Sequence, residues 1–154
     1  MRAMSTTFRA ATAADAPSVA EVYLASRKRF LPFAPLAHSD DDVRGWVTDM
    51  LIPSGRVTVA VDGERIVGLM ALSRADGFGW VDQLYLDPAS VAHGIGTALL
   101  ERAKRELGRP IRLHTFQANA GARRFYERHG FRALEFGDGS GNEENCPDVL
   151  YEWR

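Results

Sequence analysis

The stretch Gly79–Leu107, GWVDQLYLDPASVAHGIGTALLERAKREL, decides the fold of this chain. Residues 79–86 predict a β-strand, and Pro88 ends it because proline has no N–H to donate to a strand partner. After a Gly-Ile-Gly-Thr turn, apolar residues recur over 95–107 at the i, i+4 spacing of an α-helix. Gly108 then supplies a stop signal. The stretch therefore predicts a strand, a glycine-rich turn and a helix.

A strand that runs through glycines into a helix N-terminus forms a general binding site for anions. The first-turn N–H groups have no intrahelical partner, and the helix dipole adds partial positive charge there. Gly94 and Gly96 let a bulky diphosphate approach the backbone closely. We therefore expect a phosphorylated ligand at residues 91–97, and a purely structural turn is the alternative. Leu99 replaces the third glycine of the dinucleotide-binding fingerprint, and the Gly-Lys-Ser/Thr of a P-loop is missing.

Composition limits the class of protein. The chain has 154 residues, 45% of them hydrophobic, and a formal net charge of −1. Its length predicts one domain, 1–154, and its near-neutral charge predicts no nucleic-acid or membrane partner. Because the N-terminal residues lack an apolar signal core, we expect a cytoplasmic protein. The single Cys146 excludes an intramolecular disulfide and is expected to be a structural thiol. No metal site is expected, because the four histidines lack metal-ligand spacing.

Capping signals predict the elements of the N-terminal third. A short strand at 6–10 precedes Asp15, which is followed by a first-turn proline and begins a helix. Ser39 or Asp40 caps a second helix. Its apolar positions fall on one side, and they are Val43, Trp46, Val47, Met50 and Leu51. These elements are core architecture and imply no function.

Turn signals and alternating apolar residues predict the central sheet. Strands at 57–61, 66–72 and 79–86 are joined by Asp-Gly turns, which predicts an antiparallel meander. A strand at 111–116 follows the glycine-rich helix and is expected to run parallel to 79–86. Asn119 caps a further helix that Gly130 ends, and two strands close the sheet at 131–136 and 149–153. The fold class is therefore α/β with a mixed sheet.

Two motifs in this order resemble one protein family. The first, residues 84–88 followed by 94–100, resembles the acyl-CoA-binding core motif of the GNAT N-acetyltransferase superfamily. The second, NAGARRFYERHGF at 119–131, resembles the next motif of that superfamily. The core motif usually opens with Gln or Arg three residues before its first glycine, where this chain has Val91. A side-chain contact to the pyrophosphate is lost by that change, whereas backbone contacts are not.

The resemblance implies a GNAT-like fold and acetyl-CoA as the co-substrate. In the family, an antiparallel meander is followed by a βαβ unit whose parallel strands splay into a V, and the pantetheine arm pairs with strand backbone. Carried onto this sequence, the cofactor-binding residues are Leu84, Tyr85, Leu86, Val91, Ala92, His93, Gly94, Ile95, Gly96, Thr97, Asn119, Arg123 and Tyr126. Arg123 or Arg124 is the basic residue expected at the CoA 3′-phosphate.

Tyr126 and Asp82 are the first candidates for proton transfer. Tyr126 matches the tyrosine that donates a proton to the CoA sulfur in many members, and a core aromatic is its alternative role. Asp82 lies two residues before Leu84, so strand alternation places both on one face, toward the cleft mouth. Asp82 is therefore a candidate base, directly or through water, and a solvent-facing strand residue is its alternative role. The acids of the segment 138–148 are the other candidates for the base.

Two segments without a motif are expected to contact the acceptor. The loop 30–36 holds Phe30 and Phe33 together with two prolines, and it is either a wall of the acceptor pocket or a loop packed on the core. The segment 138–148 carries four acids, including Glu143 and Glu144, and no basic residue. It is either a solvated face, as charge runs usually are, or a loop over the acceptor side that attracts a cationic amine.

The sequence therefore predicts an acetyl-CoA-dependent N-acetyltransferase that transfers the acetyl group directly to a primary amine in a ternary complex. The amine is a small molecule or a peptide, and a homodimer through the last strand is possible. The alternative is an acyl-CoA-binding regulatory module of the same fold that has no turnover. The identity of the amine is not specified by any motif.

Overall fold

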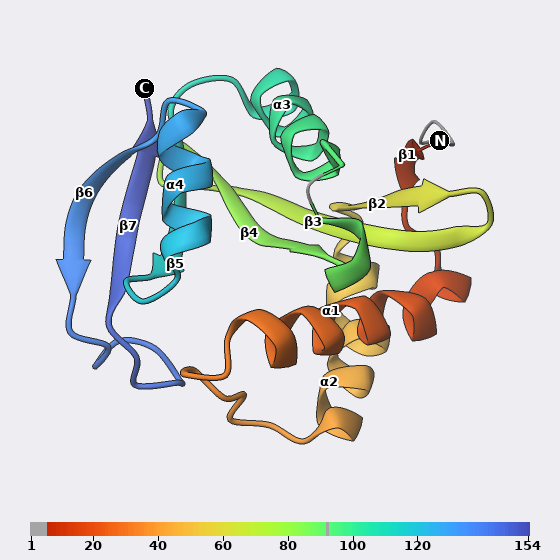
Figure 1. Cartoon of the computed structure of the whole chain (residues 1–154). Coiled ribbons are helices and arrows are strands. Elements are labelled where there is room, and N and C mark those ends of the chain that lie inside the picture. The colour runs from red at the N-terminus through yellow and green to blue at the C-terminus, as the bar shows by residue number, and fades with distance from the viewer. Residues whose placement is uncertain (1–5, 92) are drawn as a thin grey trace.

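One mixed β-sheet runs through the protein (Figure 1), whose computed structural model describes residues 6–91 and 93–154. Its seven strands lie in the order β1-β2-β3-β4-β5-β7-β6. The strands are β1 (Thr6–Ala10), β2 (Val57–Asp62), β3 (Arg65–Ala75), β4 (Phe78–Leu86), β5 (Ile111–Phe116), β6 (Arg132–Gly137) and β7 (Asp148–Trp153).

In the described residues, four α-helices connect and cover the strands. They are α1 (Ala16–Phe30), α2 (Asp40–Trp46), α3 (Ile95–Leu107) and α4 (Ala120–Arg128). A π-helical turn at Val47–Leu51 extends α2, and three short 3₁₀ segments lie at Ala13–Asp15, Ile52–Ser54 and Pro88–Ser90. Of the two predicted caps of α2, Ser39 is the one used, since its hydroxyl accepts from the Asp42 N–H at 3.1 Å.

The pairing of the strands confirms the predicted mixed sheet. β1 through β4 pair with their neighbours in antiparallel fashion, which is the expected meander. β4 and β5 are parallel, as predicted for strands joined through α3. β7 lies between β5 and β6 and pairs with both in antiparallel fashion. The sheet is thus an antiparallel meander joined to a β4-α3-β5 unit.

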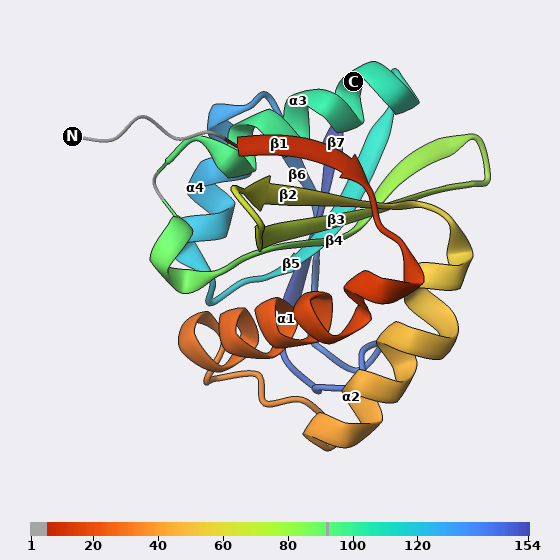
Figure 2. The same cartoon turned by 90° about the vertical axis from the view of Figure 1, so that its right-hand side faces the viewer.

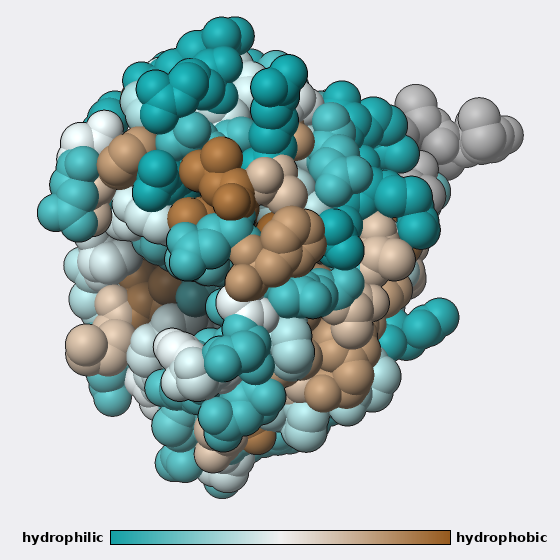
Figure 3. Space-filling model, turned by 90° about the vertical axis from the view of Figure 1, so that its left-hand side faces the viewer, coloured by the Kyte–Doolittle hydropathy of each residue, from teal (hydrophilic) through white to brown (hydrophobic). Residues whose placement is uncertain are grey.

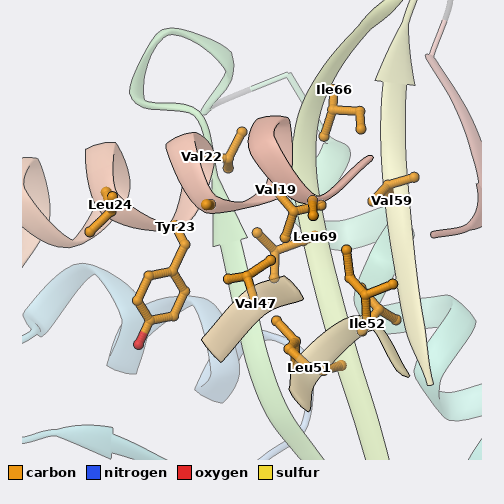
Figure 4. Packing of buried hydrophobic residues seen from close by; sticks show 14 of the residues in the cluster. Val19, Val22, Tyr23, Leu24, Val47, Leu51, Ile52, Val59, Ile66 and Leu69 are labelled. Atoms are coloured by element: carbon orange, nitrogen blue, oxygen red, sulfur yellow. The ribbon is translucent and has the colours of Figure 1, made fainter. Parts of the chain in front are cut away.

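Two hydrophobic clusters hold the helices on opposite faces of the sheet (Figure 2). On one face, α1 and the turn after α2 pack on β2 and β3, and Figure 4 shows Val19, Val47 and Leu69 at the centre of this cluster. On the other face, α3 and α4 pack on the strands through residues such as Leu99 and Tyr126. A layer of helices on each face is the common solution for burying both faces of a sheet that contains parallel strands.

The expected apolar side of the second helix is partly wrong. Val43, Val47 and Leu51 are buried as predicted, but Met50 is 66% exposed. The prediction assumed a regular α-helix, whereas Val47–Leu51 forms a π-helical turn with a wider spacing per turn. Met50 therefore points outward, and a pattern with 3.6 residues per turn does not predict this.

β4 and β5 pair only at one end. The paired positions are Gly79 with Ile111 and Trp80 with Arg112, although β4 continues to Leu86 and β5 to Phe116. Beyond these positions the two strands separate (Figures 1 and 2), while each keeps its antiparallel partner on the other side. The predicted V between the parallel strands is confirmed. The edge of β4 that faces β5 has no strand partner among the described residues from Val81 onward.

The end of the sheet formed by β6 is an open edge. Hydrophobic residues are visible among polar ones on this face of the molecule (Figure 3), and β6 contributes the exposed side chains Leu134 and Phe136. Within the described part of the chain, no helix combines the length and apolar character that crossing a membrane requires.

A buried carboxylate organises the start of α1. Asp15 occupies the N-cap position, but its side chain points back toward β1 instead of capping the helix. Its oxygens accept from the two terminal nitrogens of Arg9 at 2.7 and 3.0 Å and from the Thr12 N–H at 2.7 Å. The hydrogen bonds from Arg9, followed by smaller effects that include the Thr12 N–H, lower the pKa of Asp15 to about 2.

We expect Asp15→Asn to lower the free energy of unfolding at neutral pH. An unfolded aspartate has a pKa of about 3.9, so the stabilisation exists above about pH 4 and is lost as the pH falls toward the folded value. Urea denaturation from pH 6 to pH 3 should show the variant and wild type converging at acid pH. Asp49→Asn, at an exposed carboxylate, is the matched control. A gap between Asp15→Asn and wild type that stays constant over this range would contradict the prediction.

Candidate functional site

Two clefts meet where β4 and β5 separate. The first, of about 670 Å³, lies between the end of β4, the start of α3 and α4, and we call it the Tyr126 cleft. The second, of about 680 Å³, lies between the V, α1, α2 and the loop 138–147, and we call it the Asp82 cleft. Tyr85 is the one described residue that lines both. Two cavities of similar size therefore lie next to each other at the V, on either side of Tyr85.

The glycine-rich turn forms one wall of the Tyr126 cleft. Gly94 is the N-cap of α3 and has φ +78°, in the left-handed region that favours glycine. No described residue accepts from the N–H groups of Ile95, Gly96 and Thr97, as expected for a first helical turn. A Cβ on Gly96 would come within 3.4 Å of the Phe125 ring, so glycine also allows α3 to approach α4. Gly94, Gly96 and Thr97 line the cleft, whereas the Ile95 side chain is buried in the core.

Tyr126 projects from α4 into this cleft. Its ring is buried among Phe125, Phe131 and Tyr151, with centroid distances of 5.2, 5.8 and 6.3 Å. Burial, with a smaller contribution from Tyr85, raises the pKa of Tyr126 well above its usual range. The hydroxyl therefore stays protonated at neutral pH, and no described residue forms a hydrogen bond with it. A protonated, unpartnered hydroxyl in a cleft is available to donate a proton to a ligand.

The prediction that Asp82 and Leu84 share one face is wrong. A register shift in the β3–β4 ladder pairs Ala71 with Gln83 but Leu72 with Val81, so Asp82 is the extra residue of a β-bulge. Asp82 consequently lines the Asp82 cleft, while Leu84 packs into the opposite cluster and lines the Tyr126 cleft. The bulge therefore places the Asp82 carboxylate in one cavity and the Leu84 side chain in the other.

The remaining cofactor candidates divide between the cleft and its surroundings. Leu84, Tyr85, Leu86, Val91 and Asn119 line the Tyr126 cleft. Asn119 also caps α4 by accepting from the Ala122 N–H at 3.2 Å. His93 is exposed and does not belong to the lining residues, and Ala92 lies outside the described residues.

Arg123 is directed away from the cleft. Its Nε donates to the Tyr151 hydroxyl at 3.0 Å, and its guanidinium lies 5.4 Å from the Phe136 ring centroid. The Tyr151 hydroxyl in turn donates to Glu127 at 2.7 Å. Arg128 lines the Tyr126 cleft in its place. Because α4 turns by about 100° per residue, the sequence alone does not show which arginine faces the ligand.

The four acceptor candidates also separate. Phe30 lines the Tyr126 cleft, not the Asp82 cleft as its assignment implied. Phe33 is 41% exposed and packs edge-on against Phe116, with ring centroids 6.2 Å apart. Glu143 and Glu144 both line the Asp82 cleft, where Glu143 contacts His38 at 2.9 Å.

Sequence reasoning missed the residues that α1 contributes. Tyr23 and Arg27 line the Asp82 cleft from positions that continue the buried i, i+4 stripe of Val19. A charged residue on an apolar stripe was the available signal, because burying a guanidinium requires specific partners. His114 of β5, stacked on Trp80 at 5.7 Å, was missed as well, and a strand residue facing a V carries no motif.

Acidic groups predominate in the Asp82 cleft. Among the described residues, five carboxylates line it, against one arginine and two histidines. Glu144 is paired with Arg27 at 2.8 Å, whereas the carboxylates of Asp42 and Asp82 have no ion-pair or hydrogen-bond partner among the described side chains. Cavity walls of one charge sign raise the local concentration of ligands with the opposite charge. In the described residues, no three His, Cys, Asp or Glu side chains are placed to hold a metal ion.

Comparison with protein-family models gives a match, whereas comparison with individual curated proteins does not. A family model described as "Acetyltransferase (GNAT) family" matches residues 20–131.

Solved structures resemble the whole length of the chain. The PaiA N-acetyltransferase of Thermoplasma acidophilum, in complex with coenzyme A, is 20% identical with a TM-score of 0.76, over 98% of this chain and 99% of that one. Apo YjaB from Escherichia coli is 20% identical with a TM-score of 0.79, over 97% and 98%. The ribosomal-protein-alanine N-acetyltransferase of Brucella melitensis is 18% identical with a TM-score of 0.71, over 95% and 98%. At these identities the likeness shows the fold.

We expect Gly94→Val to weaken the binding of coenzyme A by about tenfold or more, a loss of at least about 1.4 kcal/mol. Valine at φ +78° is strained, and relief of the strain moves the first-turn N–H groups. Gly55→Val is the matched control, because Gly55 has φ +73°, equally open surroundings and no place in either cleft. Calorimetric titration of both variants measures the effect. Equal dissociation constants for Gly94→Val and Gly55→Val would contradict it.

Proposed function

The chain belongs to the GNAT acetyltransferase family, and we propose that it transfers an acetyl group from acetyl-CoA to a primary amine by direct attack. The observation that carries the proposal is that two clefts lie on either side of Tyr85, on the part of β4 beyond its last pair with β5 at Trp80. One cleft offers backbone donors for a diphosphate and the other offers carboxylates for an amine. Both reactants can therefore be held at once, which direct transfer in a ternary complex requires.

In this proposal acetyl-CoA occupies the Tyr126 cleft. Its pyrophosphate accepts from the N–H groups of Ile95, Gly96 and Thr97 at the positive end of α3. Its pantetheine arm adds to the free edge of β4 at residues 84–86 as an extended strand would. Backbone supplies these contacts, so the valine at position 91 does not prevent them. The acetyl group then points toward Tyr85 and the Asp82 cleft.

The acceptor amine enters from the Asp82 cleft. The unpartnered carboxylates of Asp82 and Asp42 favour a cationic amine there. Asp82 removes a proton from the amine, directly or through water. The nitrogen then attacks the thioester carbonyl carbon, whose oxygen is stabilised by a free backbone N–H of β4 as negative charge develops. Collapse of the intermediate breaks the C–S bond.

The leaving sulfur needs a proton, and Tyr126 is placed to supply it. The raised pKa keeps the phenol protonated until a thiolate forms beside it. The products are an N-acetylated amine and free CoA. A cationic amine loses two protons, the first to Asp82 before attack and the second as the amide forms, whereas the sulfur gains one, so one proton is released to solvent in each turnover. Tyr126 recovers its proton from solvent through the open cleft.

A second candidate is an acyl-CoA-binding regulatory module without turnover. Val91 favours it, because this residue lines the Tyr126 cleft where the family motif usually places a polar side chain. Binding of acetyl-CoA with no acetylation of any amine would support this candidate.

Thermal denaturation with separate additions of acetyl-CoA, CoA, ATP and NAD tests the site. A ligand that binds only the native state stabilises it by about 2.7 kcal/mol at a hundredfold excess over Kd. We expect stabilisation by acetyl-CoA and CoA and none by ATP or NAD. Release of CoA thiol with spermidine, L-lysine, tyramine and an alanine-terminated peptide then tests the transfer. Absence of any stabilisation by acetyl-CoA and CoA would falsify the proposal.

We expect Tyr126→Phe to lower kcat by about 10² to 10⁴, the usual contribution of a positioned proton donor. The dissociation constant for CoA should stay nearly unchanged, because the phenyl ring keeps the packing. Tyr151→Phe is the matched control, since it removes a buried hydroxyl bonded to Arg123 and Glu127 outside both clefts. Steady-state kinetics with the fastest amine measure the effect. An unchanged kcat in Tyr126→Phe would show that another group protonates the sulfur.

A further inference from the structure

Arg27 joins four separate walls of the Asp82 cleft. From the last turns of α1, its Nη2 donates to Glu144 at 2.8 Å and to the Ala34 carbonyl at 3.2 Å. Its Nη1 lies 3.3 Å from the Tyr85 hydroxyl, and its guanidinium carbon lies 5.7 Å from the Phe116 ring centroid. Those partners belong to the loop 138–147, the loop 31–39, β4 and β5 respectively. One side chain thus contacts both strands of the V and both loops beside it.

The environment of Arg27 is unusual for a residue that serves stability alone. The Arg27 side chain is only 6% exposed, and the side chain of its partner Glu144 is 15% exposed. The buried Nε of Arg27 has no hydrogen-bond partner in the described structure. Buried ion pairs gain little net stability over apolar replacements, and an unpaired buried donor costs free energy. Arg27 therefore stands at the junction of four elements although its burial costs free energy of folding.

We infer that Arg27 is the positioning residue of the acceptor site: it holds the two loops and the two separating strands in the arrangement that receives the amine. This inference rests on the proposed function. Arg27 lines the Asp82 cleft and not the Tyr126 cleft, and of its four partners only Tyr85 lines both, which Arg27 contacts at the hydroxyl and not at the backbone. Its loss should therefore affect the acceptor and leave CoA binding in place. Only a planar guanidinium makes these contacts together, because a lysine offers one ammonium group.

The ion pair also divides the acids of the cleft into two kinds. Glu144 is neutralised by Arg27 and serves to hold its loop, so it is not free to bind the amine. A weaker contact between Glu143 and His38 joins the same two loops at the surface, where the two side chains are 70% and 54% exposed. Asp82 and Asp42 are left to meet the positive charge of the acceptor. The Arg27–Glu144 ion pair therefore holds the acceptor site together, and Asp82 and Asp42 bind the acceptor.

The test separates acceptor binding from CoA binding in Arg27→Met, Arg27→Lys and Glu144→Gln. With the fastest amine of the panel, Arg27→Met should raise the acceptor KM between about tenfold and about a hundredfold, the range that misplacement of a site produces. Arg27→Lys should recover part of this loss. The CoA dissociation constant should change less than about twofold. Glu144→Gln keeps the side-chain shape and should raise the acceptor KM in the same direction.

Hydrogen exchange of the wild type and the variants provides a readout that needs no acceptor. Amides of residues 31–39 and 138–147 should exchange faster in Arg27→Met, and those of α3 should not. Arg9→Met is the matched control, since it removes an arginine–carboxylate pair of similar length, 2.7 Å, on β1. It should lower stability without changing the acceptor KM or the exchange of either loop.

The outcomes distinguish this inference from the proposed function. Unchanged loop exchange in Arg27→Met, or a loss of CoA affinity equal to the loss of acceptor affinity, overturns the positioning role while acetyl transfer stands. If the wild type binds CoA but acetylates no amine, the transfer proposal fails, and the exchange measurement still decides whether Arg27 holds the two loops. If Arg27→Met does not fold, Glu144→Gln and Arg27→Lys decide the question with the same two readouts.

Discussion

The separation of β4 from β5 is the constraint on which the rest of the structure depends. A strand edge that loses its partner exposes N–H and C=O groups, and these groups must find other partners or remain in water. Here the edge beyond Trp80 opens into a cavity instead of being covered by a third strand. The V thus provides a backbone surface ready to pair with an extended ligand, and it divides the space around Tyr85 into two clefts.

The two clefts differ in the kind of group that lines them. The Tyr126 cleft offers backbone N–H groups at the start of α3 and a buried phenol, which suits an anionic ligand with a reactive sulfur. The Asp82 cleft offers carboxylates and aromatic rings, which suits a cationic one. The β-bulge at Asp82 makes this division possible, because an extra residue directs the carboxylate to one side and Leu84 to the other.

Local signals explain which features the sequence predicts well. The helix at 95–107 has the predicted bounds. Its signals are Gly94 before it, an i, i+4 apolar stripe along it and Gly108 after it, and all of them are local in the sequence. The bulge at Asp82, the outward turn of Met50 and the direction of Arg123 depend on neighbouring elements. Each of these features changes the direction in which a side chain faces, by a fraction of a helical turn or by one strand position. A prediction from regular periods of 3.6 and 2 residues assumes that no such shift occurs.

The sequence by itself determined the order of the elements, the glycine-rich turn, the mixed sheet and the two motifs that place the chain in its family. These features arise from contacts within a few residues, or from an alternation that one buried face enforces. Only the tertiary structure decided which cleft each candidate enters and that Arg27 lies at the junction. Its four partners are at positions 34, 85, 116 and 144, and the burial that makes such contacts significant exists only after the sheet has formed.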